Sequence, residues 1–254
     1  MALSITVVRW EVFLLVLVRA AAMLMVAPAF GARPIPAQVK IGLAALLAML
    51  LTPLQATEGP LLTNPLTVMV LVSREVLTGL LLGFAATLVF SAVQTAAQFV
   101  GVQVGYTFSN TVDPLSAQHA SFLDTFYNML ALVVFLGLGG HHALISGLAH
   151  SLEVAPLGEY GPPQSVGQSL VLLMSASFGI AVRLAMPVVG TMMLADAALA
   201  LVVRSIPQMN VFVVGLPVKM VLGIVTMIAL APMLVLGISD LTRTVGSTVV
   251  GVLR

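Results

Sequence analysis

The chain has 254 residues, of which 60% are hydrophobic and 7% are charged, and its net charge is +1. Soluble domains carry about 25% charged residues, so this composition is typical of a membrane protein, or of a subunit that other subunits cover on nearly every side. The small net charge gives no basis for nucleic-acid binding, and the absence of cysteine excludes disulfides, thiolate catalysis and Cys-ligated metals.

The first apolar run, residues 10–31, is predicted to be a retained helix. Ala27-Pro28-Ala29 resembles a signal-peptide cleavage site. However, the run is long and contains Arg19, which does not suit the apolar core of a signal peptide.

Five further apolar runs follow, separated by turns rich in proline and glycine, at residues 39–52, 66–91, 122–150, 168–203 and 211–238. A membrane-crossing helix needs about 20 apolar residues, so the run 39–52 is predicted to be re-entrant or packed against protein. The run 168–203 is too long for one crossing and contains Pro187, which predicts a kink or a break. With no repeat and no linker, the chain is predicted to form one all-helical domain over residues 1–254.

The distribution of charges does not fit six crossings. Arg33 and Lys40 favour a cytoplasmic first loop, but alternation then places Arg243 and Arg254 outside. The topology is therefore unusual, or several apolar runs do not cross the membrane.

Residues 94–118 form a polar stretch with one charged residue, Asp113. Irregular backbone at membrane depth occurs only where protein buries it or water fills a cavity beside it. The stretch therefore predicts a lumen, a gate or a partner surface. Ser91, just before the stretch, would share one face of a helix with its early residues Gln94, Gln98, Gly101 and Gly105. This face could line a lumen, bind a subunit or pack within the chain.

Asp113-Pro114 is predicted to start a helix, because aspartate caps free N–H groups and proline suits the first helical position. A mobile segment that closes a channel would also need a fixed helix start at its end, which this cap would provide. Gly105 and Asn110 before it tolerate unusual backbone angles, while Tyr106 and Phe108 provide bulk.

Other polar residues within the apolar runs have structural interpretations. Arg74-Glu75 is predicted to form an internal salt bridge or to reach the membrane interface, and Gly79 and Gly83 are predicted to allow close helix packing. Arg183, Asp196 and Lys219 are candidates for a functional role, since charges within apolar helices are usually paired and functional, and an internal salt bridge or a side chain reaching the membrane interface is the alternative.

No pattern predicts catalysis or a cofactor. His141-His142 and His150-x-x-Glu153 lack a third well-spaced metal ligand. Ser146 and His150 lie one helical turn apart, which is too local for a protease site. Phosphate-binding loops and paired intramembrane aspartates are absent from the sequence.

Several segments together resemble the FliR family of flagellar biosynthetic proteins, which are components of the type III export gate. The segments appear in the family's order over about residues 10–240, with Ala97 and Gly139 as departures. They are Ala27-Pro28-Ala29-Phe30-Gly31 with Ile35-Pro36, Arg74-Glu75-Val76-Leu77 running to Gly83-Phe84, Gln98-Phe99-Val100-Gly101, Val112-Asp113-Pro114, Gly140-His141-His142, and Pro207–Phe212 with Gly215 and Pro217. Injectisome relatives are the nearest alternative, and the Pro207–Phe212 segment is more similar to flagellar members.

The resemblance implies long, kinked helices and hairpins like a fusion of FliP-like and FliQ-like parts. It implies a single copy in a helical pore complex with FliP and FliQ, in the bacterial inner membrane at the flagellar basal body. FlhB, FlhA, lipid and unfolded rod, hook and filament subunits would be further partners.

The resemblance places a plug loop at about Tyr106–Gln118. Three groups of residues follow as the candidate site. The plug or gate residues are Tyr106, Phe108, Ser109, Asn110, Thr111, Val112, Asp113 and Pro114. The hinge residues are Gly101 and Gly105, and the lumen or subunit-interface residues are Gln94, Gln98, Gln103, Arg204, Pro207, Gln208, Asn210 and Phe212.

The alternative from another class is a self-contained secondary transporter of a small solute. Transporters usually show paired repeats around a midplane site, and this chain shows one polar break and no repeat.

Overall fold

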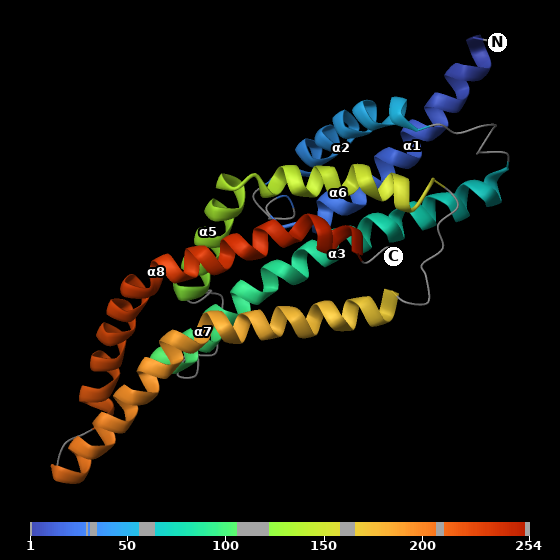
Figure 1. Cartoon of the computed structure of the whole chain (residues 1–254). Coiled ribbons are helices and arrows are strands. Elements are labelled where there is room, and N and C mark those ends of the chain that lie inside the picture. Colours follow the sequence, from blue (N-terminus) through green and yellow to red (C-terminus); the bar gives the residue numbers. More distant parts are fainter. Residues whose placement is uncertain are drawn as a thin grey trace. The chain divides into compact units, whose positions relative to one another are not determined.

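A computed structural model describes residues 2–28, 30, 35–55, 64–105, 122–157, 166–206 and 211–251. The described residues form α-helices and one short 3-10 turn, with no strand among them, so the all-helical prediction is confirmed (Figure 1). In chain order the elements are α1 (Ala2–Val26), α2 (Ala37–Leu51), η1 (Thr52–Leu54), α3 (Pro65–Val104), α5 (Phe122–Gly137), α6 (Gly140–Val154), α7 (Val166–Ser205) and α8 (Val211–Gly251).

Within the described part of the chain, four segments are long and apolar enough to cross a membrane, or five if the bent pair α5–α6 is one span. One of them is Ala37–Leu54, where α2 and η1 together reach 18 residues. The helices α3 and α7 have 40 residues each and α8 has 41. At 1.5 Å per residue each is about 60 Å long, twice the thickness of a hydrocarbon core.

Local chemistry sets the ends of α3. The side chain of Asn64 accepts hydrogen bonds from the Thr67 N–H (2.8 Å) and the Thr67 hydroxyl (2.9 Å), and Pro65 occupies the first helical position. At the other end Gly105 has a φ of +93°, a left-handed conformation that glycine adopts without strain. The first part of the polar stretch is thus regular helix, as the predicted helical face from Ser91 to Gly105 required, and this helix ends at Gly105.

The apolar run 122–150 forms two helices and not one straight helix. Gly139 has a φ of +72°, and the helices on either side of it differ in direction by 67°. A left-handed residue ends α5 and lets the chain turn into α6. Pro187, by contrast, lies inside α7 without ending it.

The chain divides into two compact units, Met1–Val89 with Gly139–Met174 and Arg243–Arg254, and Phe90–Leu138 with Ser175–Thr242. Because α3, α7 and α8 each contribute to both units, this division leaves the single-domain prediction untested.

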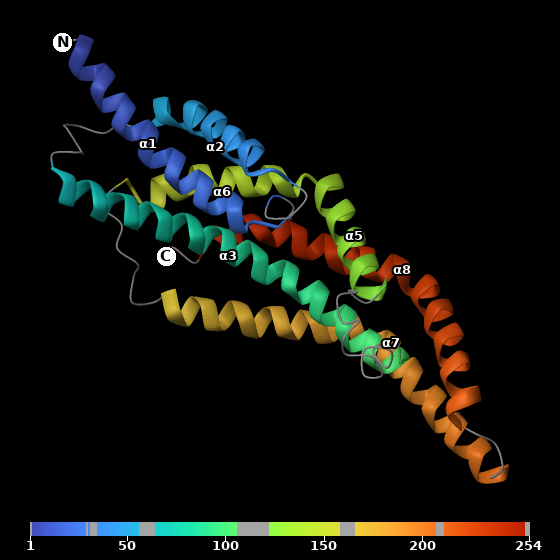
Figure 2. The same ribbon diagram turned by 180° about the vertical axis from the view of Figure 1, so that it is seen from behind.

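The first unit contains α1, α2, α6 and the beginning of α3. Figures 1 and 2 both show α1 and α2 side by side, and the two helices are in contact. A Cβ atom at Gly83 would lie 2.7 Å from the Met23 carbonyl oxygen, and one at Gly79 would collide with the Arg19 carbonyl. The two glycines of α3 therefore let α1 approach its backbone closely, and the predicted packing role of Gly79 and Gly83 is confirmed.

The second unit contains the end of α3, α5 and most of α7 and α8. Leu184 of α7 lies against Gly237 of α8, and Asp196 of α7 lies against Lys219, so the two helices are antiparallel. A Cβ atom at Gly223 of α8 would lie 2.7 Å from Val104 of α3. Phe90 and Phe99 of α3 form edge-to-face contacts with Phe135 and Phe178.

Candidate functional site

The predicted gate residues, from Tyr106 to Pro114, lie outside the described residues. Pro207, Gln208 and Asn210 also lie outside them, as does the side chain of Phe212, whose backbone belongs to α8. The structure thus describes the helix that leads to the predicted gate segment and ends at Gly105.

The predicted amide face lies on the last third of α3. Gln94 and Gln98 are both exposed. Gly101, one turn further on, is in regular helix and is buried. The Gln94 side-chain amide donates a hydrogen bond to the Asn128 side-chain oxygen of α5, at 3.0 Å. Gln94 therefore has a partner within its own unit and keeps hydrogen-bonding capacity on its exposed side.

Gln103 belongs to a polar cluster that joins three helices of the second unit. The Asp196 carboxylate on α7 accepts from the Lys219 ammonium of α8 at 2.8 Å and from the Gln103 amide of α3 at 3.1 Å. Lys219 is 19% exposed and Asp196 44% exposed. The opposite charges neutralise each other, so the cluster fixes α3, α7 and α8 together without leaving a net charge in apolar surroundings.

An open apolar groove of about 460 Å³ lies between α3 and α7 beside this cluster. Phe99, Val102 and Gln103 line it from α3, and α7 contributes Val182, Ala185, Met186 and Val189. Because its lining is almost wholly apolar, the groove suits apolar side chains or acyl chains.

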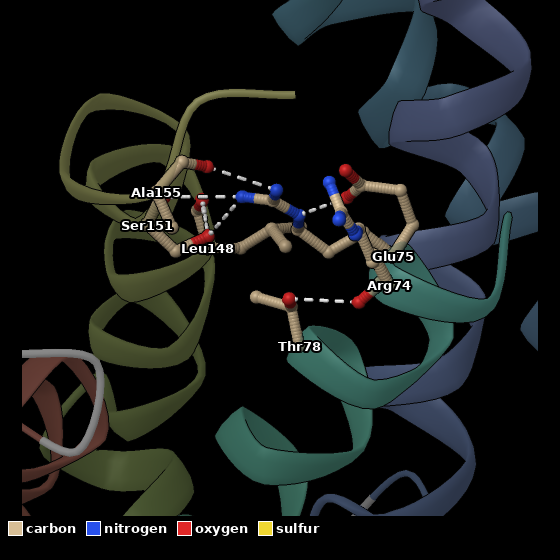
Figure 3. A network of polar contacts seen from close by, with 7 residues as sticks. Arg74, Glu75, Thr78, Leu148, Ser151 and Ala155 are labelled. Carbon is tan, nitrogen blue, oxygen red and sulfur yellow. Dashed lines mark hydrogen bonds and ion pairs between the residues drawn. The ribbon is translucent and has the colours of Figure 1, made fainter. Parts of the chain in front are cut away.

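The first unit contains a buried ionic cluster around Arg19 of α1. The Arg19 Nε donates to the Glu75 carboxylate of α3 at 2.6 Å, and both side chains are 1% exposed or less. The Arg19 Nη1 and Nη2 donate to the carbonyl oxygens of Ser151 (3.1 Å) and Ala155 (2.9 Å), as Figure 3 shows around the labelled partners. One guanidinium thus binds a carboxylate and two carbonyl groups at the C-terminal end of α6.

This arrangement follows from helix chemistry. The last four carbonyl groups of a helix have no intrahelical donor, and the C-terminal end carries partial negative charge. A planar guanidinium offers several donors in fixed directions. Arg19 thus satisfies the Ala155 carbonyl, gives a second hydrogen bond to the Ser151 carbonyl, which already accepts from the Ala155 N–H at 2.9 Å, and pairs with the Glu75 carboxylate. The predicted internal salt bridge of Glu75 is confirmed, whereas the structural role of Arg19 was missed.

Arg183 differs from these paired charges. It lies exposed near the middle of α7 and has no hydrogen-bond or ion-pair partner among the described residues. Arg204, in the last turn of α7, is also exposed, at a position where a cation complements the helix dipole.

The histidine motifs lie on α6. His150 Nδ1 is 2.7 Å from the Glu153 carboxylate, in an exposed pair one turn apart, and the rings of His141 and His142 lie 4.2 Å from each other. Among the residues with described placement, no three histidine or acidic side chains come close enough to hold a metal ion.

These features define a helical, membrane-type protein whose charges fix helices to one another. The family of bacterial export proteins, family 1, matches residues 10–245, and the chain belongs to this family. It is accordingly an export protein and not an enzyme, and the resemblance inferred from the sequence is confirmed.

Three relatives show the range of similarity. The flagellar biosynthetic protein FliR of Bacillus subtilis is 33% identical over 219 residues, which cover 85% of this chain and 84% of that protein. The protein of the same name from Escherichia coli is 34% identical over 221 residues, covering 86% and 83%. The Yop proteins translocation protein T of Yersinia pestis is 30% identical over 182 residues, covering 70% and 69%.

Proposed function

We propose that this chain is a pore-forming, non-catalytic subunit of the flagellar type III protein export gate, in the inner membrane at the flagellar basal body. The observation that carries the proposal is the similarity along 85–86% of the chain to proteins named flagellar biosynthetic protein FliR. The translocation protein T matches less of the chain, which favours the flagellar role over the injectisome role.

The exposed apolar surface supports a role as one subunit among several. Only 11% of an apolar 18-residue stretch of α7 is buried, and only 22% of one within the span Val213–Asp240 of α8. Helices about 60 Å long cannot place all of this surface in a hydrocarbon core of about 30 Å. FliP and FliQ subunits would cover the remainder, with FlhB and FlhA as further partners of the assembly.

In this proposal Tyr106–Pro114 closes the channel at rest. The end of α3 at a left-handed glycine supports a change of chain direction at Gly105, directly before this segment. Bulky Phe108 and the uncharged residues Ser109–Val112 would block ions and water, and the segment would move aside for unfolded rod, hook and filament subunits. Of the two proposed hinge glycines, Gly105 has the stronger support, because Gly101 is buried within regular helix.

The exposed amides Gln94 and Gln98 would face the channel or bind a neighbouring subunit. The turn from Arg204 to Phe212 would contact partner subunits, and the exposure of Arg204 is compatible with that role.

The plug assignment is tested by deleting residues 108–112 in cells that make the whole export complex. We expect the complex to assemble at its normal level while the membrane leaks ions, measured as growth inhibition at high salt and as conductance of the purified complex in a planar bilayer. A matched control deletes residues 158–162, a segment of the same length between α6 and α7. Unchanged conductance with an intact complex would overturn the plug assignment, and failure of the unaltered chain to purify with any other export subunit would overturn the subunit role.

A further inference from the structure

One face of α7 has the character of a surface for another helix. The stripe consists of residues that recur every three or four positions, namely Ala176, Gly179, Arg183, Met186, Gly190, Leu194 and Ala197. Residues at this spacing lie on one side of a helix. Gly190 is partly exposed and the other six are exposed, so the described chain leaves this side of α7 uncovered.

The glycines of the stripe make no close approach inside the described chain. A Cβ atom at Gly179 or Gly190 would meet no other atom within 4 Å, whereas Gly79 and Gly83 lie tightly against α1. Glycine costs about 0.5–1 kcal/mol relative to alanine in a helix interior, so the glycines at these two open positions do not stabilise α7 itself. Small residues at this spacing allow the backbone of a neighbouring helix to come close.

Arg183 places a positive charge on the stripe that needs an anionic partner. The nearest charged residue along α7 is Asp196, which already pairs with Lys219. A guanidinium among apolar side chains is costly without an anion. Arg19 and Lys219, the cations of the two ionic clusters described above, both have carboxylate partners, and Arg183 has none among the described residues.

Pro187 leaves a backbone carbonyl group near Arg183 without its helical hydrogen bond. Proline has no N–H, so the carbonyl oxygen of Arg183, four residues earlier, receives no hydrogen bond from the helix at that position. Arg183 therefore presents a cationic donor on its side chain and an acceptor on its backbone. The acyl chains of lipid offer neither an anion nor a hydrogen-bond donor.

The groove beside the stripe offers space for large side chains. Met186 lines both features, and the groove extends from it towards Phe99 and Val102 of α3. A helix lying along the stripe could insert apolar side chains into this groove while its backbone approaches Gly179 and Gly190.

We propose that the α7 stripe binds one apolar helix of another subunit of the export complex, and that a carboxylate set among the apolar residues of that helix pairs with Arg183. This inference rests on the proposed subunit role and specifies the chemistry of one partner. Charge complementarity disfavours a second copy of this chain in a symmetric contact, because two Arg183 side chains would face each other.

Cross-linking tests the identity of the occupant. The chain contains no cysteine, so single replacements carry a photoactivatable thiol probe at one site only. Met186→Cys and Leu194→Cys place the probe on the stripe. Val202→Cys is the matched control, exposed on the same helix but about 100° away from Arg183 around its axis at 100° per residue. We expect the stripe probes, in the assembled complex, to label one apolar partner helix that contains Asp or Glu, with at least fivefold less labelling of that helix from the control.

Charge exchange tests the ion pair. Arg183→Glu should lower the recovery of the complex about tenfold or more, since it places like charges together, while Arg183→Lys should retain most of it. Replacing the labelled carboxylate with lysine should restore assembly of the Arg183→Glu variant. Should that variant fail to insert in the membrane, the cross-links made with Arg183 intact still decide the question.

The opposite outcomes are distinct. Labelling of lipid alone, or of this chain alone, would overturn the proposed partner, as would full recovery of the complex with Arg183→Glu. In those cases co-purification of FliP and FliQ with the unaltered chain would leave the proposed function standing. Purification of the unaltered chain without any other export subunit would instead overturn the proposed function.

Discussion

At the scale of single residues, Arg19 joins three helices of one compact unit through a single side chain. Its guanidinium contacts Glu75 of α3 and the end of α6, and it is fully buried. Ser151 adds its own hydroxyl at 3.3 Å, and that hydroxyl donates in turn to the Leu148 carbonyl. Removing one charged member takes a buried partner away from the others, which costs more than the cluster contributes when complete.

We therefore expect Glu75→Gln and Arg19→Met each to destabilise the protein by about 3–5 kcal/mol. The double variant Arg19→Met with Glu75→Gln should lose less than the sum of these two single changes by about 1–3 kcal/mol, because both charges of the pair are removed together. Thermal unfolding of the purified complex, followed by helical circular dichroism, measures these differences. Glu153→Gln is the control, since its pair with His150 on α6 is exposed and should contribute at most about 1 kcal/mol. Equal losses at Glu75 and Glu153 would contradict the argument.

The sequence indicated that Arg74-Glu75 belonged to an internal salt bridge, but it did not indicate the partner. Arg19 lies 56 residues earlier and Ser151 lies 132 residues after Arg19. Local pattern carries no information about such distant pairs. The signal that could have been used was the presence of a strongly polar residue in the first apolar run, where a partner is required.

At the scale of secondary-structure elements, glycine spacing predicted close packing correctly. Gly79-x-x-x-Gly83 on α3 meets α1 at its backbone. The break at Gly139 was missed, because residues 122–150 are apolar on both sides of it and apolar character alone does not show a change of direction. The signal available was the cluster Gly137-Leu138-Gly139-Gly140, a typical helix end.

The packing of α1 on α3 gives a test with a matched control. Gly83→Ala should destabilise the protein by about 1–3 kcal/mol, since the new methyl group meets the backbone carbonyl of Met23, which cannot rotate away. Gly42→Ala on α2 makes the same chemical change where no atom lies within 4 Å, and should instead stabilise its helix by about 0.5–1 kcal/mol. Thermal unfolding of both variants measures the difference, and two shifts of the same sign would show that α1 and α3 do not pack in this way.

At the scale of the whole molecule, composition and apolar runs predicted an all-helical membrane-type protein, and the structure confirms this class. The sequence did not determine which apolar faces meet within the chain, since α3, α7 and α8 are apolar over most of their surface. A helix of that kind fits lipid, its own chain or another subunit equally well. The positions of charges and glycines are what distinguish a face that packs inside the chain from one that does not. Gly79 lies against α1, for example, whereas no atom lies within 4 Å of a Cβ placed at Gly179.

The same surface predicts that the chain depends on its partners. Met193, Leu194, Leu201 and Ile228 are each at least 62% exposed on helices longer than the bilayer core is thick, so some of this surface stays uncovered when the chain is alone. In cells lacking the other gate subunits, we expect the chain to be degraded several-fold faster than in cells that make them all, because uncovered apolar surface favours aggregation and proteolysis. Pulse-chase labelling measures the two half-lives. The control is an unrelated membrane protein of similar size, whose half-life should be equal in both strains. If the purified chain were instead long-lived and monodisperse, and carried a small solute across a liposome membrane by itself, a self-contained transporter would be favoured. In that case lipid alone would contact its apolar faces.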